Sequence, residues 1–220
     1  GGRRRVWVHL PPGYGEGQER YPVLLVNDGV NALGVLDLAT ELDRLAGERM
    51  QPVIAVFVEL QSAWEFARSE QDLYRDMLLE RVLPEIDRRY RTRTDPASRA
   101  VLGFGEGAYA ALFAALSRPD AFGAAASLSL SFGSSQGQRE LESLVAAAKD
   151  LPFVCLDWGR YDSRAVGQGF DTDAACRALA EALKARGARV RAQMTNDGDQ
   201  CSFWRARLPD LLTALFPPAR

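Results

Sequence analysis

The sequence predicts an α/β fold of three layers, in which helices cover both faces of a doubly wound, mainly parallel β-sheet. Short apolar stretches typical of strands alternate along the whole chain with stretches whose apolar residues recur at helical spacing. Residues 52–58 form an uninterrupted apolar run, as strands do when both of their faces are buried. A turn over residues 103–107, which begins and ends with glycine, joins an apolar strand directly to an alanine-rich helix. Together these observations favour parallel strands connected by right-handed helical crossovers.

The first half of the chain contains three predicted strands and two predicted helices. The strands cover residues 6–10, 21–26 and 52–58. The first strand ends at Pro11-Pro12-Gly13, a combination that stops regular structure. Apolar residues at helical spacing predict a helix over 33–46, which Gly47 is placed to cap, and a long helix over 73–90, interrupted near Pro84.

The second half continues the alternation. A strand ends at Gly103, and a helix runs from about Glu106 to the Arg118-Pro119-Asp120 turn. The remaining strands are predicted over 122–130, 152–157 and 188–194, and the remaining helices over 141–149, 171–186 and 203–216, with a Ser/Gly-rich loop at 131–137. Ligand sites in such sheets lie at the carboxyl ends of the strands. There we expect Asp28, Gly105, Asp162 and Asp199.

The composition indicates one domain over residues 1–220 and argues against several classes of function. With 47% hydrophobic residues and a net charge of −2, the chain can form a sizeable core and has no basic excess for nucleic acid or an anionic membrane. No apolar run reaches the roughly 20 residues of a membrane-spanning helix. Cys155, Cys176 and Cys201 lack metal-binding spacing, so we expect free thiols in a reducing, cytoplasmic compartment, no metal site and no cofactor. The start at Gly1 leaves open a domain of a larger protein, and a homo-oligomer also stays open.

The glycine-rich turn Gly103-Phe104-Gly105-Glu106-Gly107 has three interpretations. A dinucleotide-binding loop requires G-x-G-x-x-G, usually in the first strand–helix unit, whereas this turn lies in mid-chain and has a different spacing. A close strand–helix crossing with no further role is the simplest interpretation. The favoured one is a strained elbow of the kind that presents a catalytic serine in G-x-S-x-G. Its central residue here is Gly105, which adopts positive φ at low steric cost but has no nucleophilic atom.

Several further stretches resemble one family, in the right order along nearly the whole chain. They are residues 6–14, 21–29, 83–92, 118–123 and 198–205. Together with the elbow, they are similar to the esterase D / enterochelin esterase-like branch of the α/β-hydrolases. The resemblance implies an α/β-hydrolase fold. In its usual members it also implies serine esterase, thioesterase or acyltransferase activity, with a Ser, Asp, His triad in that chain order.

Carried over residue by residue, the resemblance implies a degenerate triad. The serine position is Gly105, the acid position is Asp162 in preference to Asp157, and the histidine position, counted back from Trp204, is Asp199. The only histidine, His9, lies on the first predicted strand, so a conventional triad has no base.

The resemblance also implies where an oxyanion hole and a pocket rim would lie. The hole would use the backbone N–H of Glu106 and one from the Gly29-Val30 turn. The rim would consist of Asp28, Gly29, Phe104 and Asp197.

We therefore predict a catalytically inactive member of the family, kept to bind a small carbonyl ligand or a protein partner. An alternative is an unorthodox ester or thioester hydrolase in which Asp162 and Asp199 activate water, directly or through a metal ion. Such a pair of like charges is also compatible with a shared proton, a bound cation or an arginine. A third hypothesis is an interaction module whose site is plugged by loop aromatics, namely Trp64, Phe66, Phe104 and Phe132. Lys149 and Lys184 are poor substitutes for the missing triad residues, since both lie at predicted exposed helix positions. Cys201 is a poor substitute because no histidine accompanies it to lower the pKa of its thiol.

Overall fold

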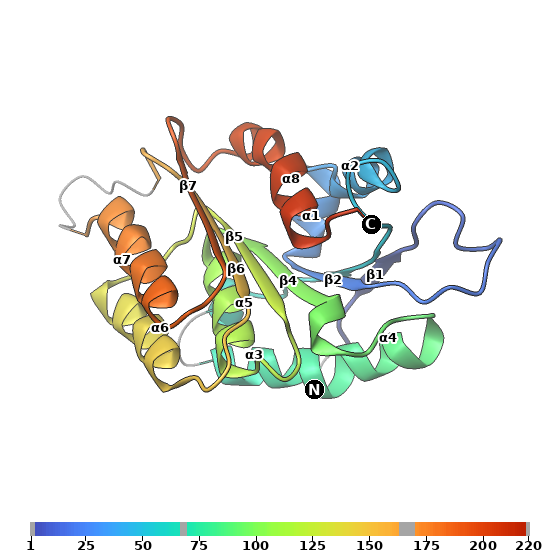
Figure 1. Cartoon of the computed structure of the whole chain (residues 1–220), viewed down its shortest axis with the longest axis horizontal. Coiled ribbons are helices and arrows are strands. Elements are labelled where there is room, and N and C mark those ends of the chain that lie inside the picture. Colours follow the sequence, from blue (N-terminus) through green and yellow to red (C-terminus); the bar gives the residue numbers. More distant parts are fainter. Residues whose placement is uncertain (1–2, 67–69, 163–169, 219–220) are drawn as a thin grey trace.

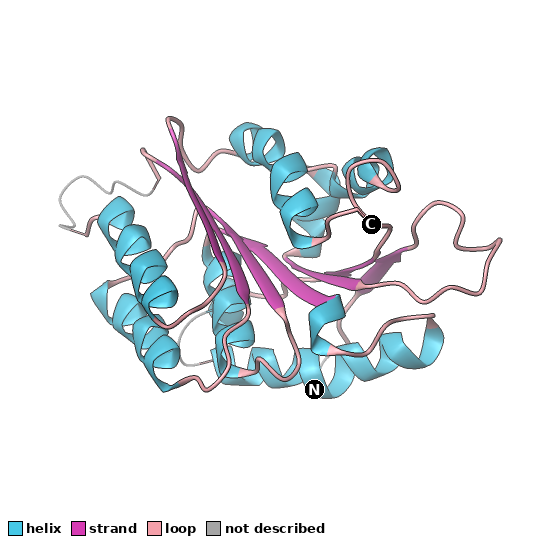
Figure 2. Ribbon diagram, viewed as in Figure 1, coloured by secondary structure: helices cyan, strands magenta, loops and turns pink. Residues whose placement is uncertain are grey.

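The structure is a computed structural model that describes residues 3–66, 70–162 and 170–218. Its centre is a seven-stranded sheet with the strand order β1-β3-β2-β4-β5-β6-β7. In the described ranges β1 runs antiparallel to β3, and every other pair of neighbouring strands is parallel. The strands are β1 (Val6–His9), β2 (Val23–Asn27), β3 (Ile54–Val58), β4 (Arg99–Phe104), β5 (Ala124–Leu128), β6 (Phe153–Gly159) and β7 (Val190–Thr195). Figure 2 shows the sheet between two layers of helices, so the predicted three-layer α/β architecture is confirmed.

Helices cover both faces of the sheet (Figure 1). One face carries α1 (Gly29–Gly34), α2 (Leu38–Leu45) and α8 (Cys201–Leu215). The other carries α3 (Gln71–Met77), α4 (Leu83–Arg89), α5 (Glu106–Ser117), α6 (Ser135–Ala147) and α7 (Thr172–Ala185). Short 3₁₀ turns lie at Ala63–Phe66 and Pro96–Ser98.

Each face of the sheet has its own apolar cluster. Leu25, Val56 and Val101 belong to the cluster under α5, whereas Leu24 and Ala55 belong to the cluster under α8. Successive strand residues point to opposite faces, and both faces are covered here. This explains why the central strands are apolar without interruption.

Three predicted elements have different bounds in the structure. The helix expected over 33–46 is two helices. The first, α1, ends at Gly34, and α2 begins only after Asp37, whose φ is 52°. The long helix over 73–90 is interrupted by a π-helical turn at Leu78–Val82, directly before α4. The loop expected over 131–137 already contains the start of α6, because the Ser134 hydroxyl accepts the backbone N–H of Gln136 at 3.3 Å.

Among the described residues, no helix combines the length and the apolar character needed to span a lipid bilayer.

Candidate functional site

The elbow between β4 and α5 has the strained geometry that its glycines suggest. Gly105 adopts φ 57° and ψ −123°. A Cβ atom built at Gly103 would lie 2.0 Å from the carbonyl oxygen of Gly107, so glycine is required there by the close approach of strand and helix. No described atom outside the turn itself lies within 4 Å of a Cβ built at Gly105. The space for a side chain at the nucleophile position is therefore open, and glycine leaves it unused.

The acid position, Asp162, lies in the turn that follows β6 and is only 3% exposed. Its Oδ2 accepts the backbone N–H of Gly159 at 2.7 Å, whereas its Oδ1 has no hydrogen-bond partner among the described residues. The Ser129 hydroxyl lies close enough to favour the ionised carboxylate but does not complete a hydrogen bond to Oδ1. Asp162 is therefore a buried carboxylate with half of its acceptor capacity unused.

The histidine position, Asp199, is exposed on the loop between β7 and α8. Burial is the main cause that raises the pKa of Asp162, and the negative charge of Asp199 raises it further. The N–H of Gly159, the hydroxyl of Ser129 and the charge of Arg207 act in the opposite direction. Asp199 therefore acts on Asp162 through its charge, while its own side chain is exposed.

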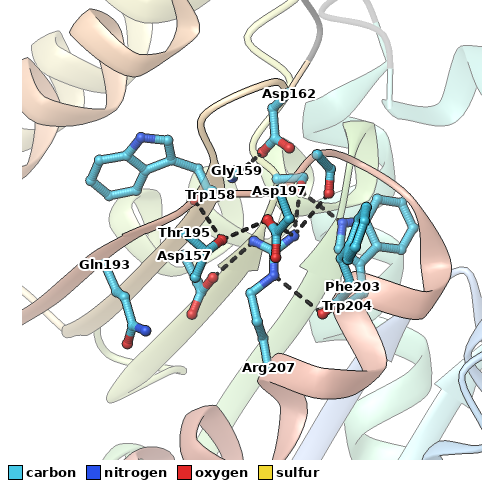
Figure 3. A network of polar contacts seen from close by, with 12 residues as sticks. Asp157, Trp158, Gly159, Asp162, Gln193, Thr195, Asp197, Phe203, Trp204 and Arg207 are labelled. Carbon is cyan, nitrogen blue, oxygen red and sulfur yellow. Dashed lines mark hydrogen bonds and ion pairs between the residues drawn. The ribbon is translucent and has the colours of Figure 1, made fainter.

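A buried arginine occupies the centre of this edge of the sheet. Arg207 of α8 has only 5% of its side chain exposed, and its Nη1 donates to Oδ1 of Asp157 at 2.9 Å. Its Nη2 donates to the carbonyl oxygen of Gly198 at 3.1 Å and lies 3.5 Å from Oδ1 of Asp197. Figure 3 shows the guanidinium between Asp157 and Asp197, with Asp162 across from it. An arginine is thus present, but it pairs with the neighbours of Asp162 rather than with Asp162 itself.

Two further side chains complete this network. The Oγ of Ser129, which has φ 54°, accepts Nε1 of Trp204 at 2.7 Å and Nη2 of Arg207 at 3.4 Å. The Oδ2 of Asp157 accepts Nη1 of Arg191 at 3.3 Å. Burial nevertheless raises the pKa of Asp157 against the opposing effect of both arginines. We call Asp157, Asp197, Ser129, Trp204 and Arg207 the buried polar network.

Sequence reasoning missed Arg207 and Ser129. Arg207 had a detectable signal, because it lies three residues after Trp204 and four before Leu211 and so shares one helix face with these apolar residues. Ser129 lay inside the strand predicted over 122–130. The observed β5 ends at Leu128, and this puts Ser129 in the first position beyond the strand.

His9 lies at the opposite end of the sheet from the elbow. It pairs with Ala55 of β3, which is in register with Leu24 and, through β2, with Ala100 of β4. Gly105 lies five residues beyond Ala100, about 16 Å along the strand direction. It also lies three strand spacings, about 14 Å, from His9 across the sheet. The Nε2 of His9 instead contacts Oδ1 of Asp43 at 2.8 Å. The imidazole therefore has no access to the elbow.

The positions expected for an oxyanion hole stand at two helix starts. Glu106 is the first residue of α5, and Val30 is the second residue of α1. The first N–H groups of an α-helix have no partner within the helix. A Cβ atom at Gly29 would lie 2.8 Å from Phe57, so a close contact between α1 and β3 requires glycine there.

The expected rim residues and loop aromatics pack against neighbouring elements. Asp28 has φ 55°, and its Oδ2 accepts Nδ2 of Asn31 at 2.6 Å. The ring of Phe104 stacks on Trp204 at 5.3 Å between centroids. The ring of Phe66 contacts Tyr74 at 5.1 Å, and the ring of Phe132 contacts Phe170 at 5.7 Å. The side chain of Trp64 lies outside the described part of the structure.

Replacing Asp162 by asparagine tests whether burial raises the pKa of this carboxyl group. A carboxyl whose pKa is raised on folding binds more protons in the native state, so stability falls as pH rises from the unfolded pKa through the folded pKa. Asp162→Asn retains an acceptor for the Gly159 N–H and carries no charge. We expect the variant to be at least as stable as the wild type at pH 7 and to show a flatter decline of Tm over that window.

Thermal unfolding at several pH values would measure this effect. Asp210→Asn, at an exposed position of α8, is the matched control and should leave the pH dependence nearly unchanged. A steeper decline in Asp162→Asn than in the wild type would contradict the burial argument.

The comparisons with known proteins agree with this geometry. A family model described as "Putative esterase" matches residues 1–215. The chain belongs to this esterase family. A curated relative, the endo-1,4-beta-xylanase/feruloyl esterase of Xylanibacter ruminicola, is 25% identical over 95% of the chain. The chain spans only 29% of the length of that relative.

Solved structures of esterases share the fold at low identity. An IroE-like serine hydrolase from Shewanella oneidensis has a TM-score of 0.83 at 20% identity, over 97% of this chain and 75% of that one. The enterobactin esterase from Shigella flexneri has a TM-score of 0.81 at 20% identity, over 98% and 56%. A ferulic acid esterase has a TM-score of 0.78 at 18% identity, over 98% and 93%. The α/β-hydrolase fold expected from the sequence is thereby confirmed.

Proposed function

We propose that this protein is a catalytically silent member of its esterase family that acts by binding a ligand at the carboxyl edge of the sheet. The observation that carries the proposal is the elbow, which keeps the strained φ of 57° but presents Gly105 in place of a nucleophile. Acyl transfer by a serine also needs a neighbouring base, and His9 is on the wrong end of the sheet.

Nearby groups are poor replacements for the missing nucleophile and base. The Ser129 hydroxyl is 97% buried and already accepts two hydrogen bonds, from Trp204 and Arg207. Lys184 pairs with Glu181 at 2.9 Å on the surface of α7, away from the elbow. The alternative of water activated by Asp162 and Asp199 through a metal lacks a ligand set, since the described residues contain no cluster of three or more metal-binding side chains. Its metal-free form remains the competing hypothesis.

The ligand of the proposed site is a small carbonyl compound. The relatives' names mention feruloyl and 2,3-di-hydroxy-N-benzoyl groups, both of which carry an aromatic ring conjugated with a carbonyl. The half-buried Trp204, whose ring packs against the buried Phe104 at this edge, is the aromatic side chain that such a ligand could contact. Aromatic acyl esters are therefore the first compounds to test.

The test is a panel of methyl ferulate, a 2,3-dihydroxybenzoyl ester, an aryl acetate and a short thioester. We expect no turnover above a heat-denatured sample of the same protein, because no attacking oxygen is present. Gly105→Ala should behave identically, since it changes the elbow without adding a nucleophile. Turnover that disappears in Asp162→Asn or Asp199→Asn would overturn the proposal and support hydrolysis by the aspartates.

A further inference from the structure

The unused acceptor of Asp162 is the strongest indication of a binding function at this edge. Oδ1 is buried and lacks a hydrogen-bond partner among the described residues, while Oδ2 of the same carboxylate is held by Gly159. A buried acceptor without a donor is destabilising, and native structures contain few of them. An incoming donor that reaches Oδ1 would therefore remove an existing penalty in addition to forming a contact.

The charge around Oδ1 selects the kind of donor. The negative charge of Asp199 acts on Asp162, and Asp157 and Asp197 lie on the same buried polar network, where Arg207 contacts both of them and Arg191 contacts Asp157. Arg207 donates to Asp157 and to the Gly198 carbonyl and forms no hydrogen bond with Asp162, although its charge acts on that carboxylate from a distance. The excess of negative charge favours a positively charged donor over a neutral one.

The loop over Oδ1 is held mainly through two residues, because Arg207 contacts Gly198 and Asp197, and Asp197 also accepts the Thr195 hydroxyl at 2.6 Å. The carbonyl oxygen of Asp197 lies close to Oδ1, since both are 2.5 Å from a Cβ built at Gly159. The backbone N–H of Tyr161 donates to that carbonyl at 2.9 Å, while Asn196, Asp199 and Gln200 of the same loop are exposed. A Cβ atom at Gly198 would touch only Tyr161, at 3.6 Å or more. A ligand would reach Oδ1 by displacing this loop, which breaks the contacts of Arg207 with Gly198 and Asp197 and the hydrogen bond from Tyr161 to Asp197.

We propose that Asp162 anchors a ligand bearing a cationic N–H donor, such as a guanidinium, imidazolium or primary ammonium group, beneath the 196–200 loop. This inference rests on the proposed binding function and names the chemical class of one part of the ligand. The cation would donate to Oδ1 of Asp162 and face Asp199 at the mouth of the site. Its positive charge would offset the excess of carboxylates.

Methylguanidinium is the probe, and acetate at equal ionic strength is the opposite-charge control. A cation of so few atoms binds with a Kd of about millimolar at best, which saturation-transfer NMR titration can measure. We expect binding to the wild type and to Asp210→Asn, binding at least about tenfold weaker to Asp162→Asn, and no saturable binding of acetate. The exposed Asp210 makes its variant a control for the loss of one negative charge on the surface.

Three results would overturn the inference: no saturable methylguanidinium binding to the wild type, equal binding to Asp162→Asn, or preferential binding of acetate. If Asp162→Asn does not fold, Asp199→Asn replaces it, because its side chain is exposed. Binding weakened about threefold in that variant supports the site, and unchanged binding refutes it. The ester panel on the same preparations tests catalytic silence separately, so turnover would refute the proposed function without touching this result.

Discussion

A variant carrying both Gly105→Ser and Asp199→His is expected to hydrolyse an aryl acetate at least about 100-fold faster than either single variant, the lower end of the contribution of a positioned general base. The elbow already has φ 57° and open space where the serine Cβ would stand. A histidine at position 199 would offer an N–H donor to Oδ1 of Asp162, which lacks one. The double variant would thus assemble a nucleophile, a base and an acid that orients the base.

Steady-state rates of the double variant, both single variants and the wild type measure this prediction. Adding Asp162→Asn to the double variant is the decisive control, because it removes the acceptor that orients the imidazole and should abolish most of the gain. Equal rates in the double variant and in Gly105→Ser alone would contradict the assignment of position 199 to the histidine.

Replacing Arg207 by methionine is expected to lower the free energy of unfolding by about 3 kcal/mol, the lower end for breaking a buried ion pair by removing one partner. Methionine fills a similar volume but leaves Asp157, which is 1% exposed, without its 2.9 Å partner. Arg191 still contacts the other oxygen of Asp157 at 3.3 Å, which is why the lower end of the range applies. The carbonyl oxygen of Gly198 and the hydroxyl of Ser129 also lose a donor.

Urea denaturation of Arg205→Met provides the matched comparison. Arg205 lies on the same helix, is half exposed and is 3.6 Å from Asp37, so its loss should cost less than about 1 kcal/mol. Adding Asp157→Asn to Arg207→Met should restore part of the lost stability, because it removes the unpaired buried charge. If both arginine variants lose the same amount, the buried polar network does not stabilise this edge of the sheet.

Most of the architecture could be predicted from the sequence, because the determining signals are local. Uninterrupted apolar runs marked β2 and β3, and glycine at 103 and 107 marked the close crossing of β4 and α5. The bounds of helices were less predictable where a single residue adopts a left-handed backbone conformation. Asp37 ends one helix and starts another in a stretch whose apolar spacing alone suggests continuity.

The candidate site was predictable only in part. The elbow follows from the glycine spacing beside a recognisable strand, whereas the assignment of Asp162 to the acid position is implied only by the family resemblance. The buried polar network joins Ser129, Asp157 and Arg207, which are up to 78 residues apart. No local pattern pairs such residues, so the network required the folded chain.

By itself, the sequence determined the fold class, the glycine at the centre of the elbow and the presence of a single histidine, His9, because periodicity and residue identity are properties of the chain alone. The tertiary structure decided what the edge of the sheet contains instead. The register of β1, β3, β2 and β4 puts His9 at the end of the sheet opposite the elbow. The packing of α8 on the sheet brings Arg207 to Asp157. Burial and hydrogen-bond partnership depend on which distant segments meet, and for this reason the unused oxygen of Asp162 became visible only in three dimensions.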